Sequence, residues 1–171
     1  MTSNNSHQPS IYNRLLEQVR TLWHDAGEET RPTLEWLVNR AREKLGLVEE
    51  IGREEAEKIG DYLKRDMEDA ATYLASPEAN ELGEWLKLDI ELIEQEALEL
   101  FTSVADQTKL ELLALEERAR RASEYHTGEI TGIGTLYCKN CGKTIHFHKT
   151  GHIPPCPQCH HTQYQRKNKN S

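Results

Sequence analysis

The sequence has no apolar run that approaches the ~20 residues a membrane-spanning helix needs. Its first ten residues also lack the apolar stretch of a secretory signal peptide. Hydrophobic residues make up only 36% of the chain and aromatic residues 6%. We therefore expect a cytoplasmic protein with no membrane association, and 171 residues leave room for one or two compact domains.

Motifs of common enzymes are also absent. The chain has no glycine-rich phosphate-binding loop, no nucleophile motif and no internal repeat of solenoid length. We therefore expect a protein without catalytic activity.

Charge and cysteine are distributed unevenly along the chain. Residues 1–125 carry 15 Lys and Arg against 28 Asp and Glu, whereas residues 126–171 carry six basic residues and one acid. All four cysteines lie in the second part, and all twelve alanines lie in the first. This shift predicts a boundary between two modules near residues 125–128.

The acidic part has the composition and periodicity of helices. Its prolines stand at positions 9, 32 and 77, each where a helix is expected to begin, and Ser76-Pro77-Glu78 is typical of a helix start. The helical tracts are 11–27, 33–75 and 77–125. Gly46, Gly52 and Gly60 are the positions where the second tract is expected to bend or break.

Apolar residues recur every three or four positions on both sides of Pro77. The earlier stripe is Leu45, Val48, Gly52, Ala56, Ile59, Leu63, Met67, Ala70 and Leu74; the later one includes Leu82, Leu86, Ile90, Ile93, Ala97, Leu100 and Val104. The pattern predicts a mainly α fold, in which a long antiparallel, coiled-coil-like helical hairpin or bundle precedes a small C-terminal β ribbon. Unbroken arms would be roughly 65–70 Å long. Self-association through Ile93, Leu100 and Val104 is one use for the later stripe.

The second part contains Cys138-x2-Cys141 and Cys156-x2-Cys159, separated by fourteen residues. Each pair lets one tight turn present two thiolates, and two such turns supply the four ligands of a closed tetrahedral zinc site. Short β signals at 135–137, 144–148 and 162–164 surround the pairs. The spacing therefore predicts a zinc ribbon with one structural Zn²⁺. A four-thiolate iron centre, two disulfides, a redox Cys-x-x-Cys and a catalytic zinc are the alternatives.

Two further features of this module bear on its geometry. Gly142 suits the conformation expected after the first cysteine pair, and His160 occupies the same place after the second, where glycine would be easier. The segment 127–134 contains three glycines, so we expect weak coupling between the modules. Docking through Ile130, Ile133 and Leu136 would couple them instead.

The segment 125–134, followed by the two cysteine pairs and Gln163-Tyr-Gln-Arg166, resembles the uncharacterised bacterial zinc-ribbon-containing proteins of the YbeL type. The resemblance implies that Cys138, Cys141, Cys156 and Cys159 bind the metal and that the protein is bacterial and cytoplasmic. The domains expected are a disordered N-terminus (1–10), an acidic helical domain (11–125), a glycine-rich junction (126–134), the ribbon (135–167) and a disordered tail (168–171).

Two functions are compatible with these features. The first is a non-enzymatic scaffold or interaction protein that docks a protein partner. The second is a nucleic-acid-binding ribbon, in which basic residues contact phosphates and aromatic residues stack on bases. The residues concerned are Lys139, Lys143, Lys149, Arg166, Lys167 and Lys169, with Tyr137, Phe147 and Tyr164. The acidic helices would repel phosphate, which favours the first.

Overall fold

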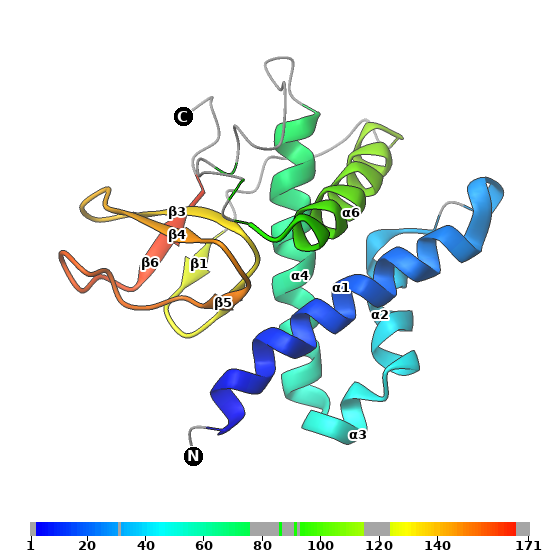
Figure 1. The fold of residues 1–171 in the computed structure, drawn as a ribbon, viewed down its shortest axis with the longest axis horizontal. Helices are drawn as coiled ribbons and strands as arrows, with labels where there is room; N and C mark the ends of the chain where they lie inside the picture. The colour runs from blue at the N-terminus through cyan, green and yellow to red at the C-terminus, as the bar shows by residue number, and fades with distance from the viewer. Residues whose placement is uncertain are drawn as a thin grey trace.

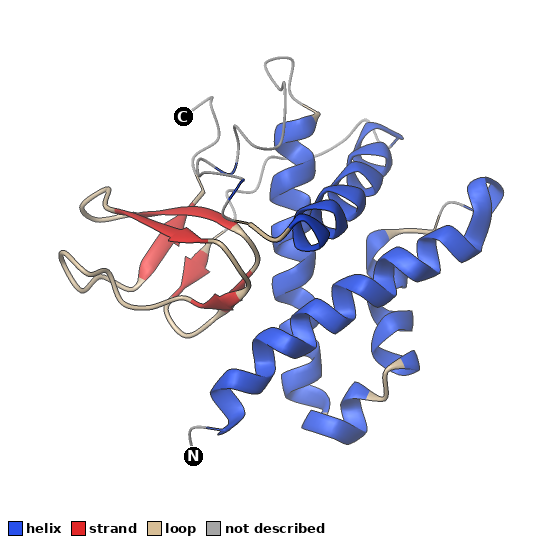
Figure 2. Cartoon of the chain, viewed as in Figure 1, coloured by secondary structure: helices blue, strands red, loops and turns tan. Residues whose placement is uncertain are grey.

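The computed structural model describes residues 3–30, 32–75, 86, 91, 93–114 and 124–166. Within these residues, five helices are followed by six short strands. The helices occupy one side of the molecule and the strands the other (Figure 1, Figure 2). The predicted class, helices followed by a small C-terminal β ribbon, is confirmed. No described helix is both long and apolar enough to cross a bilayer.

The helices are α1 (Ser3–Thr30), α2 (Leu34–Lys44), α3 (Leu47–Ile51), α4 (Arg53–Leu74) and α6 (Gln95–Ala114). Helix α1 begins at Ser3, within the segment expected to be disordered, and contains Pro9 rather than starting at it. Contacts with α3 hold this first part in place, since His7 Nε2 and Arg14 Nη1 both lie 3.0 Å from Glu50 Oε1.

Glycine divides the tract expected over 33–75 into three helices. Thr33 caps α2 by accepting a hydrogen bond from the N–H of Trp36, and left-handed Gly46 (φ 62°) and Gly52 (φ 88°) then end successive helices. Helix α4, with 22 residues, is therefore about 33 Å long. The chain is not α-helical at Ile93 and Glu94, immediately before α6. The long arms of the predicted hairpin are thus not seen among the described residues, and the turn expected at Ser76-Pro77 lies outside them.

Helix α4 is the centre of the helical part and packs against α1, α2, α3, α6 and β2. The predicted stripe is confirmed along this helix, where its members from Ala56 to Ala70 are all buried. Val48 breaks the pattern, since it lies in the short helix α3 and is 40% exposed. Ile93 and Val104 are buried inside the same core. Leu100 is only half-buried at the edge of this core, so two of the three residues proposed for self-association pack within the chain.

The strands are β1 (Tyr125–His126), β2 (Ile130–Thr131), β3 (Gly134–Cys138), β4 (Thr144–Phe147), β5 (Gly151–His152) and β6 (Gln163–Gln165). Four of them form an antiparallel sheet in the order β1-β6-β3-β4, and β2 pairs with β5. The sequence predicted β3, β4 and β6. The others have only two residues each, which is too short for an alternating pattern to be visible.

The segment expected to be a flexible junction is instead the contact between the two parts. Ile130 and Ile133 are buried in the core of the helices. A Cβ at Gly132 would lie 2.9 Å from the Tyr12 hydroxyl and 3.1 Å from the Phe101 ring. Here glycine allows a close approach of the backbone to the helices, so Gly132 does not weaken the coupling between the two parts as expected.

This close approach predicts that Gly132→Ala destabilises the protein by about 1–3 kcal/mol, because the added methyl group overpacks the contact. Gly151→Ala is the matched control, since its Cβ would meet the nearest atom at 3.7 Å, an ordinary contact. Urea unfolding of the zinc-loaded proteins measures both, and we expect the control to stay within about 0.5 kcal/mol of the wild type. Equal stability of the two variants would contradict this account of the contact.

Candidate metal centre

Each of the two cysteine pairs is held by a turn of the same conformation. After the first pair, Gly142 adopts a left-handed conformation (φ 76°) and its N–H donates to the carbonyl of Cys138 at 3.0 Å. After the second, His160 adopts φ 62° and donates to the carbonyl of Cys156 at 2.9 Å. No other described non-glycine residue has a positive φ. The expectation that His160 replaces a glycine is confirmed.

These turns bring the four thiols to one point. All four Sγ atoms lie within 4.8 Å of one another, and all four are free of disulfides. Sγ of Cys138 lies 3.6 Å from that of Cys159, and Sγ of Cys141 lies 3.6 Å from that of Cys156. A tetrahedral ion with zinc–sulfur bonds of ~2.3 Å places its sulfurs about 3.8 Å apart. The spacing of the sulfurs therefore suits one ion.

The surroundings of the cluster favour the thiolate, the form that binds metal, at two of the four cysteines. At Cys141 the backbone N–H of Lys143 lowers the pKa, but burial and the neighbouring thiols outweigh it and raise the pKa to about 12. The side chain of Asn140 and the backbone N–H of His161 donate toward Cys159 and lower the pKa of its thiol to about 6. At Cys156 burial opposes the charge, but the N–H groups of Cys159 and Gln158 outweigh it and lower the pKa. The donor set thus has the chemistry of a zinc site.

The histidines of the ribbon do not join this cluster. Within the described residues, the four cysteines are the one group of His, Cys, Asp and Glu side chains close enough to share a metal ion. His146, His148 and His160 are exposed, while His152 and His161 are half-buried. Four thiolates already fill a tetrahedral shell, so no histidine is needed.

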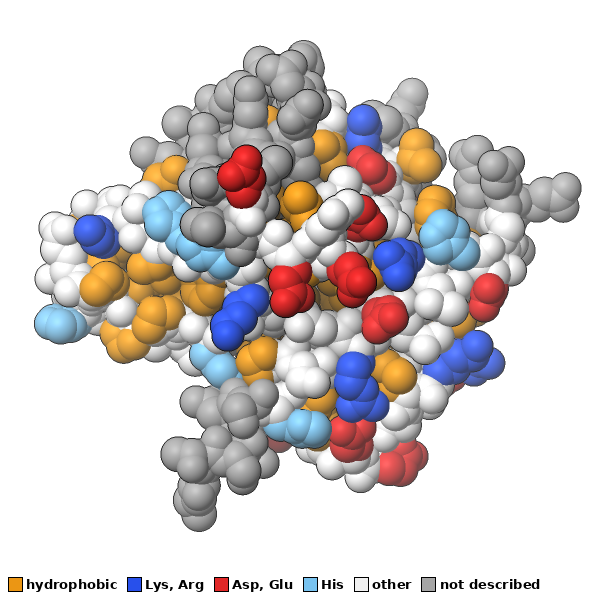
Figure 3. Space-filling model, viewed as in Figure 1, with side chains coloured by type: hydrophobic (Ala, Val, Ile, Leu, Met, Phe, Trp, Pro, Cys, Tyr) orange, Lys and Arg blue, Asp and Glu red, His pale blue; other side chains and the backbone are white. Residues whose placement is uncertain are grey.

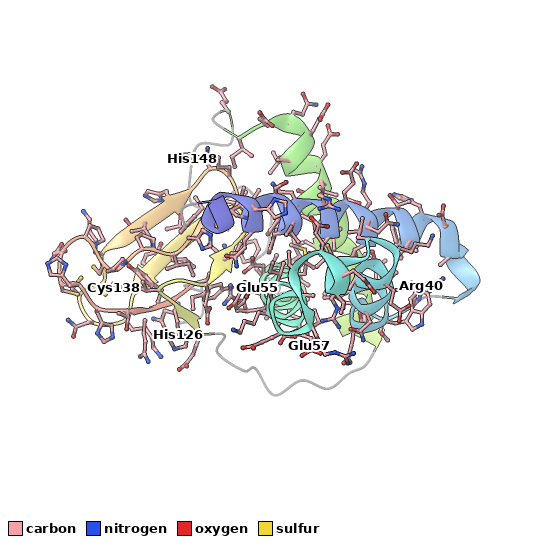
Figure 4. All side chains as sticks on the ribbon, turned by 90° about the horizontal axis from the view of Figure 1, so that it is seen from below. Arg40, Glu55, Glu57, His126, Cys138 and His148 are labelled. Carbon is pink, nitrogen blue, oxygen red and sulfur yellow. The ribbon has the colours of Figure 1, made fainter. Side chains whose placement is uncertain are left out.

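A small apolar core surrounds the thiols. Its buried members besides the cysteines are Tyr125, Leu136, Ile153 and Tyr164, with Ile145 and Phe147 at its edge. Tyr164 lies on β6, opposite Cys138 of β3, and its hydroxyl donates to the carbonyl of Pro154 at 2.7 Å. So few apolar residues do not hold a ribbon together without a metal. Cys138 lies near the outer end of the ribbon, far from Arg40 of α2 (Figure 4).

A small antiparallel sheet whose two cysteine turns meet at one point defines a zinc ribbon. The comparison with protein families agrees: the chain belongs to the family described as zinc-ribbon containing domain, whose model matches residues 21–168. The four clustered cysteines of this domain support one structural zinc site.

Curated relatives extend this similarity over most of the chain. The chain is 28% identical, over 162 residues, to the uncharacterized protein YbeL of Escherichia coli strain K12. The match covers 91% of this chain and 97% of that protein, and the proteins of the same name in strains O6:H1 and O157:H7 match equally. These relatives support the predicted YbeL-like family. No solved structure matches the chain.

The left-handed turn at His160 predicts a stabilising substitution. His160→Gly removes the strain of a side chain at φ 62°, and we expect the zinc-loaded protein to gain up to about 1 kcal/mol. Gly142→Ala places a side chain in the matching turn and should destabilise by a similar amount. Competition with a zinc-binding dye, together with urea unfolding, measures both changes. Destabilisation by His160→Gly would show that the imidazole contributes more than its backbone conformation.

Proposed function

We propose that the protein is a non-enzymatic interaction module, in which Cys138, Cys141, Cys156 and Cys159 bind one structural Zn²⁺ and the ribbon and helices together form a docking groove. Four thiolates leave no position open for water or substrate, which supports a structural metal over a catalytic one. The groove carries the proposal, because it combines surfaces from both parts of the molecule.

The ligand assignment has a direct test. Purified protein with its affinity tag removed should contain close to one zinc ion per chain and little iron. Replacement of one cysteine from each pair, in Cys138→Ser plus Cys156→Ser, should abolish tight binding because two ligands remain. Elemental analysis measures both proteins. A red, iron-bearing product from zinc-replete cells, or full metal content in the double variant, would overturn the assignment.

The groove lies between α1, the beginning of α6 and the turn that joins β4 to β5. Its apolar lining residues are buried or half-buried and form the base, whereas its carboxylates are exposed and form the rim. The apolar residues include Leu16, Leu100, Phe101, Ile133 and Phe147, and the acidic residues are Glu17, Glu94, Glu96 and Glu99. Thr150 Oγ1 donates to Asn13 Oδ1 at 2.7 Å and so ties the ribbon wall to α1. Figure 3 shows acidic side chains gathered around a hollow near the centre of this face.

The charge of the groove indicates the kind of partner. Its four carboxylates face two cations, Arg20 and Lys149, which leaves it acidic. Glu94, Glu96 and Glu99 are all exposed, and no ion pair within the described part of the chain engages them. Acidic rims above apolar bases suit basic segments that carry apolar side chains. We therefore propose a basic, amphipathic segment of a partner protein as the occupant.

Some of the residues expected from the sequence to bind nucleic acid are not accessible for such contacts. Arg166 and Tyr164 are buried and cannot contact a phosphate or a base. Lys139 is paired with Glu124, at 3.1 Å. Lys167 and Lys169 lie outside the described residues. These observations favour a protein partner.

A labelled synthetic peptide with Lys and Leu at helical spacing tests the groove by fluorescence anisotropy. We expect Glu96→Lys plus Glu99→Lys to weaken binding by roughly tenfold, because each reversal replaces an attraction with a repulsion. The control is Glu35→Lys plus Glu57→Lys, which makes the same charge change at exposed positions of α2 and α4.

If both double variants lose peptide affinity equally, the effect depends only on net charge, and the proposed binding of the peptide in the groove is wrong. The same proteins are titrated with labelled single- and double-stranded nucleic acid at low salt, where we expect no binding. Salt-sensitive binding to nucleic acid but not to the peptide would replace the proposal with the second function.

A further inference from the structure

A carboxylate is buried where the ribbon meets the helices. Asp66 of α4 is fully buried, and its oxygens accept hydrogen bonds from the Tyr12 hydroxyl at 2.5 Å and the Gly132 N–H at 2.7 Å. Arg65 and Arg166 lie 3.5 and 3.6 Å from it. Of these groups, Tyr12 and Arg65 belong to the helices, whereas Gly132 and Arg166 belong to the ribbon. The charge of a helical residue is therefore balanced partly from the ribbon.

Arg166 reaches Asp66 from the end of β6. Its guanidinium is 3% exposed and donates to the Tyr125 hydroxyl at 2.9 Å, to Thr131 Oγ1 at 2.9 Å and to the Ile133 carbonyl at 3.2 Å. A Cβ at position 134 would collide with this guanidinium, so Gly134 leaves the space it occupies. The cation is held by bonds from several segments of the ribbon.

Tyr125 links the same network to the cysteine cluster. Its ring belongs to the small core around the thiols, and the guanidinium carbons of Arg65 and Arg166 lie 4.0 and 5.2 Å from its centre. Its hydroxyl donates to Asp69 of α4. Burial raises the pKa of Tyr125 well above the ordinary value, so the phenol keeps its proton and remains a donor.

Strand β6 connects the metal site to this network within a few residues. Tyr164 pairs with Cys138 on one side and with Tyr125 on the other, and Arg166 follows two positions later. The thiols hold the strands in this register only while they share an ion, because the apolar core of the ribbon is small.

We propose that the zinc site acts as a lock on the helical part, because the metal holds β6 in the register that places Arg166 against Asp66. When zinc leaves, β6 loosens and Asp66 loses its ribbon partners. The buried carboxylate then keeps only the Tyr12 hydroxyl and Arg65, which is unfavourable, so water must enter. The packing of α4 against Tyr12, Ile130 and Ile133 then weakens.

The zinc-dependent contact also determines whether the docking groove is complete. This consequence rests on the function proposed above. Ile133, Phe147 and Gly151 form its ribbon wall. If the ribbon separates from α4, the groove therefore loses this wall. Zinc loss is therefore expected to disable docking although the cysteines do not line the groove.

Hydrogen exchange of the full-length wild-type protein tests the lock without any partner. A strong chelator under reducing conditions should lower protection of α4 amides by roughly a hundredfold or more, and the helical melting temperature by at least about 6 °C. Metal analysis confirms that zinc has been removed. Unchanged protection of α4 in the zinc-free protein would overturn the proposal.

Substitution of Arg166 separates the lock from the metal. Arg166→Met should keep one zinc ion per chain yet reproduce most of the α4 protection loss, and the chelator should add little further. Asp66→Asn in the Arg166→Met background should restore protection, because it removes a buried charge that only Arg65 still balances and keeps the shape of the side chain. Lys139→Met is the matched control, since it removes a ribbon cation whose pair with Glu124 is exposed.

The outcomes of these measurements are distinct. Equal effects of Lys139→Met and Arg166→Met, or no rescue by Asp66→Asn, would overturn the role of the buried pair. The wild-type exchange experiment keeps the proposal falsifiable if Arg166→Met fails to fold. Peptide binding is then measured with and without zinc. A lock that is confirmed while the peptide never binds would reject only the docking function.

Discussion

A carboxylate inside an apolar core is stable only when its charge and its hydrogen bonds are satisfied. The helices supply Asp66 with one hydroxyl and one guanidinium, and the ribbon supplies a backbone N–H, a second guanidinium and Thr131. The position of the ribbon follows from this requirement. Gly132 must bring its N–H within reach of α4, and Ile130 and Ile133 must enter the helical core beside it. The two parts share one buried site and do not form independent modules.

The features that were predictable from sequence are local ones. The spacing of Cys138, Cys141, Cys156 and Cys159 was enough to predict that they form one cluster, because each pair is contained in one turn. The stripe along α4 was also predictable, since helical periodicity needs only neighbouring residues. His160 belongs to this class, because its place after a cysteine pair required a left-handed backbone.

The features that could not be predicted depend on residues far apart in the chain. From sequence, Arg166 is grouped with the lysines of the ribbon as a phosphate contact, although Asp66, a hundred positions earlier, holds it inside the molecule. Gly132 and Gly134 predict weak coupling between the modules, because nothing near them in the sequence reveals that Tyr12 and Arg166 lie against them. The signal available was weak: an arginine two positions after a strand tyrosine, on the same face of the ribbon edge.

The distribution of charge on the protein favours the proposed basic protein segment over a nucleic acid as the partner. The chain has a formal charge of −8, and four thiolates around Zn²⁺ add −2, so the loaded protein carries about −10. Two of the ribbon residues expected from sequence to contact a nucleic acid, Arg166 and Tyr164, are buried. The exposed residues that line the groove include four carboxylates and one lysine, beside apolar residues that are buried or half-buried. A phosphate polymer would meet repulsion from both the rim and the molecule as a whole, whereas a basic segment would be attracted by both. In the proposed function, a zinc ion bound by the four cysteines would therefore contribute to recognition only through the strands that it holds in register.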